Sequence, residues 1–238
     1  MPTATPASSH TATGDDQHPD DQHTNDRRVD DKQVDDEQVD DKPQVYAAAD
    51  AAFTALVSAI EAAIGQRTEH QANPQTALAA ITLYLHPVQA ALASLMHDQI
   101  GYAQDTWPPE PAHQVRAAWE SQRHVAEALD ACYTPPSDVV LATDHTLAAM
   151  AGRVQAAMRQ YHAAGGYYQL AAAVQAATTA QAGLAQLITT AVSAASIVPA
   201  EAPGLDRQRL DEAVHGAGHA TRTLTALART TDTIVEIV

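Results

Sequence analysis

The sequence predicts an all-α protein: an antiparallel bundle of about six long, alanine-rich helices, preceded by a disordered acidic N-terminal arm. Three observations lead to this prediction. After residue 43, apolar residues recur in alternating steps of three and four, the spacing of a single helix face. No stretch alternates at period two over the length of a strand. Proline and glycine interrupt the helical pattern about every 30 residues, so each stretch between two breaks has the length of one long helix.

The arm, residues 1–43, differs from the rest of the chain in charge and in periodicity. It holds twelve acidic and four basic side chains, and from Gly14 to Pro43 each five-residue unit has aspartate at its third position. A period of five matches neither a helix nor a strand, so no continuous apolar face forms. We therefore expect a disordered arm at 1–43 and an α-helical domain at 44–238. The arm is interpreted as a solubilising tail or as an electrostatic tether for a basic partner.

Six stretches after the arm carry the helical spacing, and short links between them favour antiparallel, up-and-down packing. The predicted helices are 45–70, 75–104, 111–133, 137–163, 167–197 and 204–236. We call the line of positions on the apolar face of each helix its seam. The seams include Phe53, Leu56 and Ile60; Leu78, Ile81, Leu85, Val88, Leu92 and Leu95; Val115, Ala118, Gln122, Val125, Leu129 and Cys132; Val140, Thr143, Leu147, Met150, Val154 and Tyr161; and Leu210, Ala213, Ala217, Ala220, Leu224 and Leu227.

Proline and glycine set the boundaries of these helices. Asn73-Pro74 places a capping side chain before a proline at the first helical position, which starts the second helix. Pro87 lies inside that helix, and we expect a kink there because the apolar seam keeps its phase across it. The segment 107–111, with three prolines, is expected to be a stiff extended link. Further breaks are predicted at Pro135-Pro136, at Gly165-Gly166 and over 199–204.

The fifth predicted helix has an unusual composition, because residues 163–200 contain no Asp, Glu, Lys or Arg. About 20 apolar residues would be enough to cross a membrane. Four glutamines in this stretch and the lack of a basic cluster on either flank argue against a span. We expect a helix covered by its neighbours, and no association with a membrane.

The last helix carries the candidate metal ligands Asp211, Glu212, His215 and His219. Asp211, His215 and His219 are four residues apart and share one face, and Glu212 with His215 has the E-x-x-H spacing of di-iron bundles. No second E-x-x-H element is present, and the apolar seam of this helix places His215 on the solvent side. These residues are therefore predicted to be solvated, and no cofactor is expected.

Composition excludes other kinds of site. One cysteine, Cys132, allows neither a disulfide framework nor a CxxC zinc site. Gly-rich phosphate loops, G-x-S-x-G elbows and H-E-x-x-H motifs are absent from the sequence. The net charge of −16 argues against direct nucleic-acid binding. The first thirty residues hold no apolar stretch, so no secretory signal is expected and the chain is assigned to the cytoplasm.

The leading hypothesis is a non-enzymatic helical interaction or scaffold protein that self-associates or binds a protein partner. Alanine-rich seams bury little apolar area per residue, so self-association or a partner helix would add stability. Trp107 and Trp119 are candidate partner anchors, with packing in the core or in a link as the alternative. Two other hypotheses stay open: a metal-dependent or carboxylate enzyme built in the bundle, and an acidic phosphate mimic that inhibits a nucleic-acid-binding protein. The sequence does not decide whether the chain is an enzyme, but it favours a chain without enzymatic activity.

Overall fold

The computed structural model describes residues 42–66, 74–141, 143–165, 170–199 and 202–235. The predicted acidic arm therefore lies almost wholly outside the described residues, as do Tyr167 and Tyr168. Within the described ranges the secondary structure is helical, without a strand, and one isolated antiparallel bridge joins Tyr133 to Leu205. The all-α prediction is confirmed.

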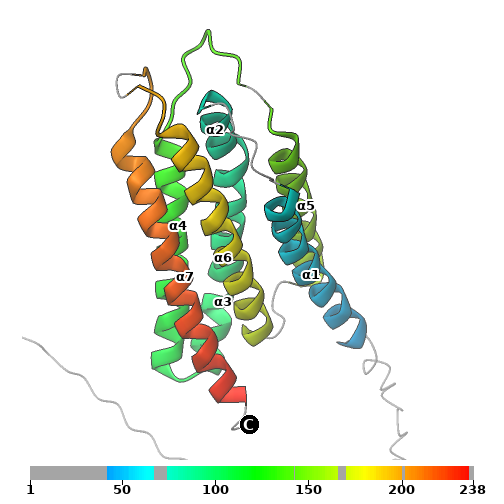
Figure 1. Cartoon of the computed structure of the whole chain (residues 1–238). Coiled ribbons are helices and arrows are strands. Elements are labelled where there is room, and N and C mark those ends of the chain that lie inside the picture. Colours follow the sequence, from blue (N-terminus) through cyan, green and yellow to red (C-terminus); the bar gives the residue numbers. More distant parts are fainter. Residues whose placement is uncertain (1–41, 67–73, 142, 166–169, 200–201, 236–238) are drawn as a thin grey trace, which may run out of the picture. The chain divides into compact units, whose positions relative to one another are not determined.

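The described helices form six rods (Figure 1). They are α1 (Lys42–Gln66), α2 (Pro74–Ala80), the π-helical turn η1 (Ile81–Leu85), α3 (His86–Thr106), α4 (Pro109–Ala131), α5 (His145–Ala163), α6 (Leu170–Ala195) and α7 (Arg207–Val235). Because α2, η1 and α3 follow one another without a break, they make up a single rod. Successive rods run up and down in Figure 1, so neighbours along the chain are antiparallel.

The second rod continues through Pro87, as the phase of its seam predicted. Proline lacks the N–H that would bind the carbonyl four residues earlier, and its ring crowds that carbonyl. The helix widens to accommodate this: the N–H of His86 donates to the carbonyl of Ile81, five residues back. Ile81, Leu85 and Val88 are nevertheless all buried, so the core-facing side keeps its register across the π turn.

The predicted start of the fourth helix at residue 137 is wrong. The helix begins at His145, where the Asp144 carboxylate accepts a hydrogen bond of 3.0 Å from the N–H of Leu147. An aspartate in this position satisfies an N–H that has no partner within the helix, and so favours a start there. Val140, assigned to the seam from its spacing, is 93% exposed in the preceding loop.

The predicted extended link at 107–111 is also wrong in length. Only Trp107 and Pro108 have extended backbone between α3 and α4. Pro109 already belongs to α4, and Glu110 lies in its first turn. Proline is compatible with the first turn of a helix, because the N–H groups there have no partner inside the helix. Three prolines in five residues thus shorten this connection to two residues.

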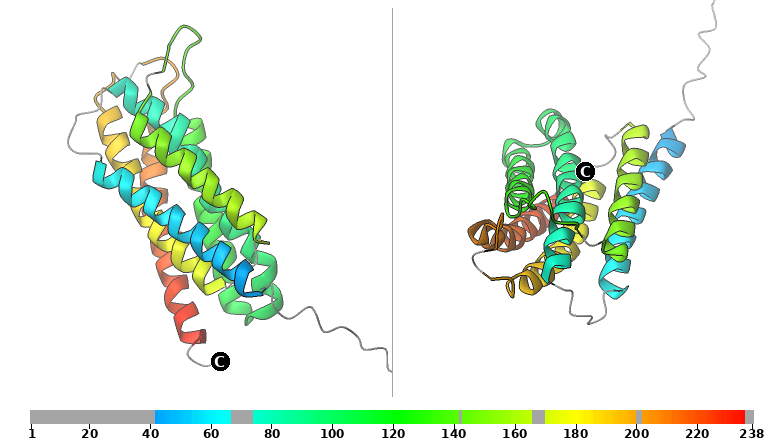
Figure 2. Two further views of the ribbon diagram at one scale, coloured as in Figure 1. Left: turned by 90° about the vertical axis from the view of Figure 1, so that its right-hand side faces the viewer. Right: turned by 90° about the horizontal axis from the view of Figure 1, so that it is seen from above.

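The rods are arranged as a ring of four helices with a two-helix layer beside it (Figure 2). In the ring, α4 packs against α3 and α7, and α6 packs against α7 and α3. The layer consists of α1 and α5; α1 packs against α6, and α5 packs against α3 and η1. Buried residues of both parts form one continuous hydrophobic core. The helices therefore share a core, although only four of them close into a ring.

Close packing between the layer and the ring depends on small side chains. A Cβ atom placed on Gly183 of α6 would lie 2.7 Å from Cγ2 of Ile60 on α1. Ala59, Ala63, Ala177 and Ala180 are also buried on these two helices. The uncharged helix α6 contacts α7, α1, α3 and α2, so it is covered by neighbours, as its composition suggested.

Two segments of the described chain are long and apolar enough to cross a membrane by length and composition, Ala47–Gln66 and Pro74–Thr106. Neither is α6, the helix for which a membrane span was considered from the sequence. The share of residues buried inside the protein is 39% for the first window and 56% for the second. Core helices of soluble proteins meet the same criterion, so this finding is weak on its own. It does mark α1 as an apolar helix with a large open side.

Candidate functional site

The four candidate ligands on α7 do not come together. Asp211, His215 and His219 are exposed, as the seam of this helix predicted. Nδ1 of His215 lies 2.8 Å from the backbone oxygen of Asp211, which ties the imidazole back to its own helix. Within the described ranges, no three His, Cys, Asp or Glu side chains are placed to hold a metal ion together.

Glu212 differs from the other three candidates because it faces neighbouring polar side chains. Its Oε1 accepts a hydrogen bond of 2.8 Å from Gln208, and Oε2 lies 2.8 Å from Nη1 of Arg209. The hydrogen bond from Gln208 lowers the pKa of this carboxyl, and Arg209 lowers it further. Glu212 is therefore stabilised as a carboxylate at the surface of α7, which suits an ion pair.

Cys132 directly follows α4 as its C-terminal capping residue and is completely buried. Its Sγ donates to the backbone oxygen of Leu129 at 3.1 Å. Burial raises the pKa of the thiol to about 12, so the thiolate is scarcely populated at neutral pH. A nucleophilic role requires the thiolate, and this environment disfavours it.

The interior of the ring contains polar side chains that sequence analysis had not linked. Gln89 of α3 and Gln181 of α6 exchange amide hydrogen bonds of 3.0 and 3.1 Å, and Gln122 of α4 donates to Oε1 of Gln181 at 3.2 Å. All three are fully buried. We call them the glutamine triad. It joins three helices of the ring, and Oε1 of Gln122 has no hydrogen-bond partner among the described residues.

Sequence reasoning placed Gln122 on the seam of its helix but treated Gln181 only as a polar residue that argued against a membrane span. Gln89 was not singled out. A glutamine at a seam position was the available signal, because buried polar side chains require partners. The partners come from helices 33 and 92 residues away from Gln89 and 59 residues from Gln122, so their identity could not be read from local spacing.

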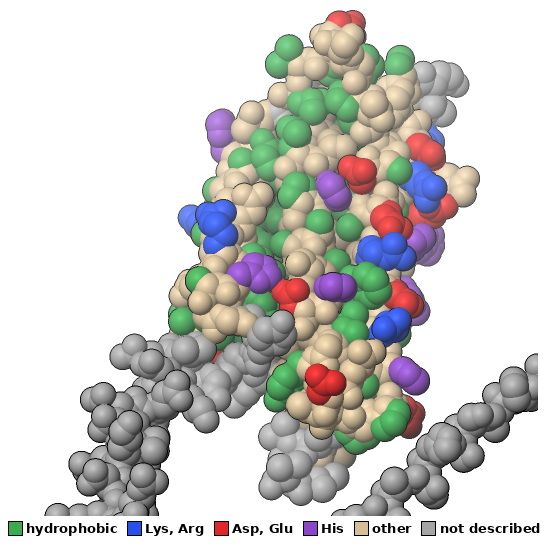
Figure 3. All heavy atoms as spheres, turned by 180° about the vertical axis from the view of Figure 1, so that it is seen from behind, with side chains coloured by type: hydrophobic (Ala, Val, Ile, Leu, Met, Phe, Trp, Pro, Cys, Tyr) green, Lys and Arg blue, Asp and Glu red, His purple; other side chains and the backbone are tan. Residues whose placement is uncertain are grey.

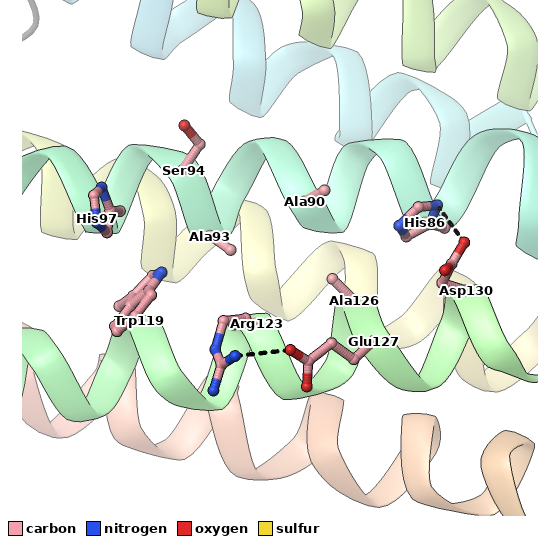
Figure 4. Close-up of a pocket in the computed structure, with 10 residues that line it drawn as sticks. All are labelled: His86, Ala90, Ala93, Ser94, His97, Trp119, Arg123, Ala126, Glu127 and Asp130. Atoms are coloured by element: carbon pink, nitrogen blue, oxygen red, sulfur yellow. Dashed lines mark hydrogen bonds and ion pairs between the residues drawn. The ribbon is translucent and has the colours of Figure 1, made fainter.

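A surface groove of about 410 Å³ lies between α3 and α4 (Figure 4). Its floor is made of alanines, Ala90 and Ala93 from α3 and Ala126 from α4. Trp119 and His97 stand at one end, with ring centroids 5.2 Å apart. His86 and Asp130 lie at the other end (Figure 4). The groove therefore combines a small-residue floor with polar and aromatic ends.

Charges of both signs line the rim of this groove. Arg123 binds Glu127 one turn further along α4, with 2.8 Å between Nη1 and Oε1, and its guanidinium lies 5.4 Å from the centre of the Trp119 ring. Nδ1 of His86 is 3.7 Å from Oδ1 of Asp130. Figure 3 looks onto this side of the protein, where histidines and charged side chains are interspersed with apolar surface. The groove thus has a cationic, aromatic end and an acidic end.

Asp98 connects the ring to the two-helix layer. Its Oδ2 lies 3.6 Å from Nδ1 of His162 on α5. Burial raises the pKa of the Asp98 carboxyl, and the nearby His162 and His97 offset only part of that rise. One residue further on, Gln99 donates a hydrogen bond to the hydroxyl of Tyr161. These contacts hold α5 against α3 with polar groups beside an otherwise apolar junction.

Comparison with known proteins provides no relative: no family model, no curated protein and no solved structure matches this chain. Function must therefore be inferred from the geometry of the described residues. Among them the buried polar side chains are four glutamines and Thr231, none of which titrates near neutral pH. The groove between α3 and α4 combines shape, aromatic surface and charge, which makes it the best candidate for a binding site.

Proposed function

We propose that this chain is a non-enzymatic helical interaction protein and that its α3–α4 groove receives a helical segment of a partner protein. The observation that carries the proposal is the alanine floor of the groove beside the partly buried Trp119. Alanines let a second helix approach closely, and tryptophan is among the residues that contribute most to protein–protein binding. The acidic arm would act as solubiliser or electrostatic tether, and the chain would work in the cytoplasm without binding nucleic acid or a membrane.

The dimensions of the groove suit a short amphipathic helix. Trp119 and Asp130 are eleven residues apart on α4, which corresponds to about 16 Å or three helical turns. A partner helix would lay small apolar side chains on Ala90, Ala93 and Ala126. An acidic residue at one end of that helix would meet Arg123, and a basic residue at the other end would meet Asp130.

The hypothesis of a metal-dependent or carboxylate enzyme gains no support from the described residues, whose candidate ligands are dispersed along α7. The hypothesis of a phosphate mimic concerns the arm and is separate from the groove. Deleting residues 1–43 separates the two interaction hypotheses, because a phosphate mimic would lose its partner and a groove-bound partner would remain.

The groove is tested with a photoreactive amino acid incorporated at Ser94, which is exposed on its rim. The matched control carries the same group at Thr190, which is exposed on α6. After irradiation in a lysate of the source cells, we expect a defined cross-linked protein from the Ser94 position and not from Thr190.

Trp119→Ala is then added to the Ser94 variant. Gln186→Ala, at an exposed position of α6, serves as its control. The cross-link should disappear with the tryptophan substitution and persist with the glutamine substitution. Identical products at both photoreactive positions, or products indifferent to Trp119, would contradict the proposed groove function. Circular dichroism of each variant establishes that the helices remain folded.

A further inference from the structure

The outer face of the α1–α5 layer is a second unpartnered surface, on the opposite side of the layer from the ring (Figure 2, left). The two helices run antiparallel, and Nε2 of Gln160 on α5 donates to the backbone oxygen of Ala48 on α1 at 3.3 Å. Among the described helices, α1 contacts α5 and α6, and α5 contacts α1, α3 and η1. No described residue covers the outer side.

Small uncharged side chains dominate this outer face. On α1 the exposed positions include Ala47, Ala51, Thr54, Ala55 and Ser58, and on α5 they include Ala149, Gly152, Ala156 and Ala163. A hollow of about 360 Å³ runs between the two helices and is lined by Ala55, Ser58, Ala59, Arg153, Ala156, Ala157 and Gln160. Because most of these side chains are small, another helix pair can approach this face closely.

Charges on this layer are separated by sign between the two helices. The exposed acidic residues of α1 are Asp50 and Glu61, and the exposed arginines of α5 are Arg153 and Arg159. Asp50 is nine residues from Ala59, which at about 100° per residue places it on the side of α1 away from α5. Arg159 is two residues from Ala157 and is likewise on the side of α5 away from α1. Asp50 thus lies at an acidic outer edge and Arg159 at a basic outer edge, whereas Arg153 lines the central hollow.

Asp50 and Arg159 also lie at the same height along the layer. The hydrogen bond from the Gln160 side chain to the Ala48 carbonyl places these two residues at a similar height. Asp50 lies two residues after Ala48, and Arg159 lies one residue before Gln160, so on antiparallel helices both are displaced in the same direction. Their offsets from the bonded pair differ by about 1.5 Å, so Asp50 and Arg159 lie at a similar height.

We infer that the α1–α5 face binds a second copy of this chain about a two-fold axis parallel to the helices. Such an axis keeps the height of each residue and places α1 of one copy over α5 of the other. Asp50 of each copy then faces Arg159 of the other copy, and the ion pair forms twice. Charge complementarity between the edges therefore favours another copy of the same layer as the partner. Each α1 then lies antiparallel to α5 of the other copy.

The area of this face is compatible with a dimer of modest affinity. The exposed side of α1 extends from Ala47 to Gly65, about 27 Å, and two helices side by side are about 20 Å wide. The footprint is roughly 540 Å² per copy, or roughly 1,100 Å² for both, which is near the lower limit for a specific interface. The inference extends the proposed interaction function to a second surface, and rests on that function only in treating the chain as an interaction protein.

Cysteine cross-linking of the full-length protein tests the orientation of the dimer. Within one copy, Asp50 and Arg159 are on opposite edges of the layer, too far apart for a disulfide, which requires Cα atoms within about 7 Å. The double variant Asp50→Cys/Arg159→Cys should therefore give a covalent dimer on mild oxidation. Asp50→Cys alone and Arg159→Cys alone should remain monomeric in a denaturing gel, and the buried Cys132 is common to all three proteins.

Sedimentation of the unmodified chain tests the face without cross-linking. Ala156→Glu places a carboxylate in the centre of the face and should weaken dimerisation at least roughly tenfold. Ala226→Glu on the exposed side of α7 makes the same change in net charge and should leave the dimer intact. Asp50→Arg should weaken the dimer, and adding Arg159→Asp should restore it.

A chain that stays monomeric at high micromolar concentration would overturn the inference, as would equal sedimentation of the Ala156→Glu and Ala226→Glu variants. Flotation with phosphatidylcholine vesicles serves as a further test, since binding that Ala156→Glu abolishes would assign the face to a lipid surface instead. The groove is assayed separately by the Ser94 cross-link. Loss of that cross-link with an intact dimer, or the reverse, shows which of the two proposals has failed.

Discussion

The four-helix ring and the two-helix layer solve the same packing problem in different ways. Every helix of the ring has a neighbour on two sides, and its interior includes the glutamine triad. In the layer, α1 and α5 contact the ring on one side, and no described residue covers the other side. Both parts use alanine at their seams. Small side chains therefore specify close helix contact in this protein, and the number of neighbours decides whether a face is core or surface.

The loops at the ends of the two parts offer the largest contrast. Gly204, before α7 of the ring, and Gly165, after α5 of the layer, both have positive φ angles. A Cβ on Gly204 would lie 1.9 Å from the backbone oxygen of Thr134, whereas one on Gly165 meets nothing within 4 Å. Gly204→Ala should cost at least about 3 kcal/mol and Gly165→Ala about 1 kcal/mol, as measured by urea denaturation. Equal costs would mean that the backbone angle alone governs both positions.

A cavity in the layer should reveal whether it opens independently of the ring. Leu56 of α1 is almost completely buried, and Leu56→Ala should cost about 3 kcal/mol. Because α1 and α5 have fewer neighbours, we expect hydrogen exchange to accelerate first in these helices. Leu92→Ala in α3 should accelerate exchange throughout the ring. Uniform acceleration in both variants would show a single cooperative unit.

The glutamine triad offers a test of polar specificity within the ring. Gln181→Leu removes the acceptor of two amide groups and leaves Gln89 and Gln122 buried without it. This change should cost about 1–3 kcal/mol. Replacing all three glutamines by leucine removes the unsatisfied groups together and should restore most of that stability. Thermal unfolding of the unmodified chain and both variants checks this order, and a triple variant less stable than Gln181→Leu would refute it.

Substitution of two glycines inside helices should have smaller effects on stability, which depend on whether the glycine contacts another helix. A Cβ atom on Gly101 of α3 would have no heavy atom within 4 Å, whereas one on Gly183 of α6 would abut Ile60 of the layer. Gly101→Ala should stabilise the protein by about 1 kcal/mol, because alanine favours the helix. Gly183→Ala should lose that gain to the contact with Ile60. Equal melting temperatures for the two variants would show that α1 yields without cost.

The smallest effect is expected at the polar contact between the two parts. Burial raises the pKa of Asp98, so the folded state binds a proton more readily than the unfolded state. Stability therefore falls as pH rises through the ordinary aspartate value, 3.8, and then through the raised folded value. Asp98→Asn should make the protein slightly more stable at pH 7, and the advantage should vanish near pH 3. Urea titrations at both pH values check the sign, and a less stable variant at pH 7 would show that the contact with His162 dominates.

Much of the fold could be predicted from local pattern. The seams from Leu78 to Leu95 and from Leu210 to Leu227 are buried throughout, because an apolar repeat of 3.6 residues has one face to bury. The same rule placed His215 on the solvent side. It failed at Val140, where the spacing continued by coincidence past a helix start that Asp144 determines. The prolines after Trp107 are compatible both with an extended link and with the first turn of a helix. The sequence pattern does not show where α4 begins, so it does not distinguish the two.

The sequence alone determined that this chain forms helices, where most of them begin and end, and which side of each is apolar. Local hydrogen bonding and the helical repeat suffice for those properties. Only the tertiary structure decided that four helices close into a ring and that Gln89, Gln122 and Gln181 meet. It also decided that no other described helix covers the outer side of α1 and α5. Those outcomes depend on contacts between residues dozens of positions apart, which no local pattern encodes.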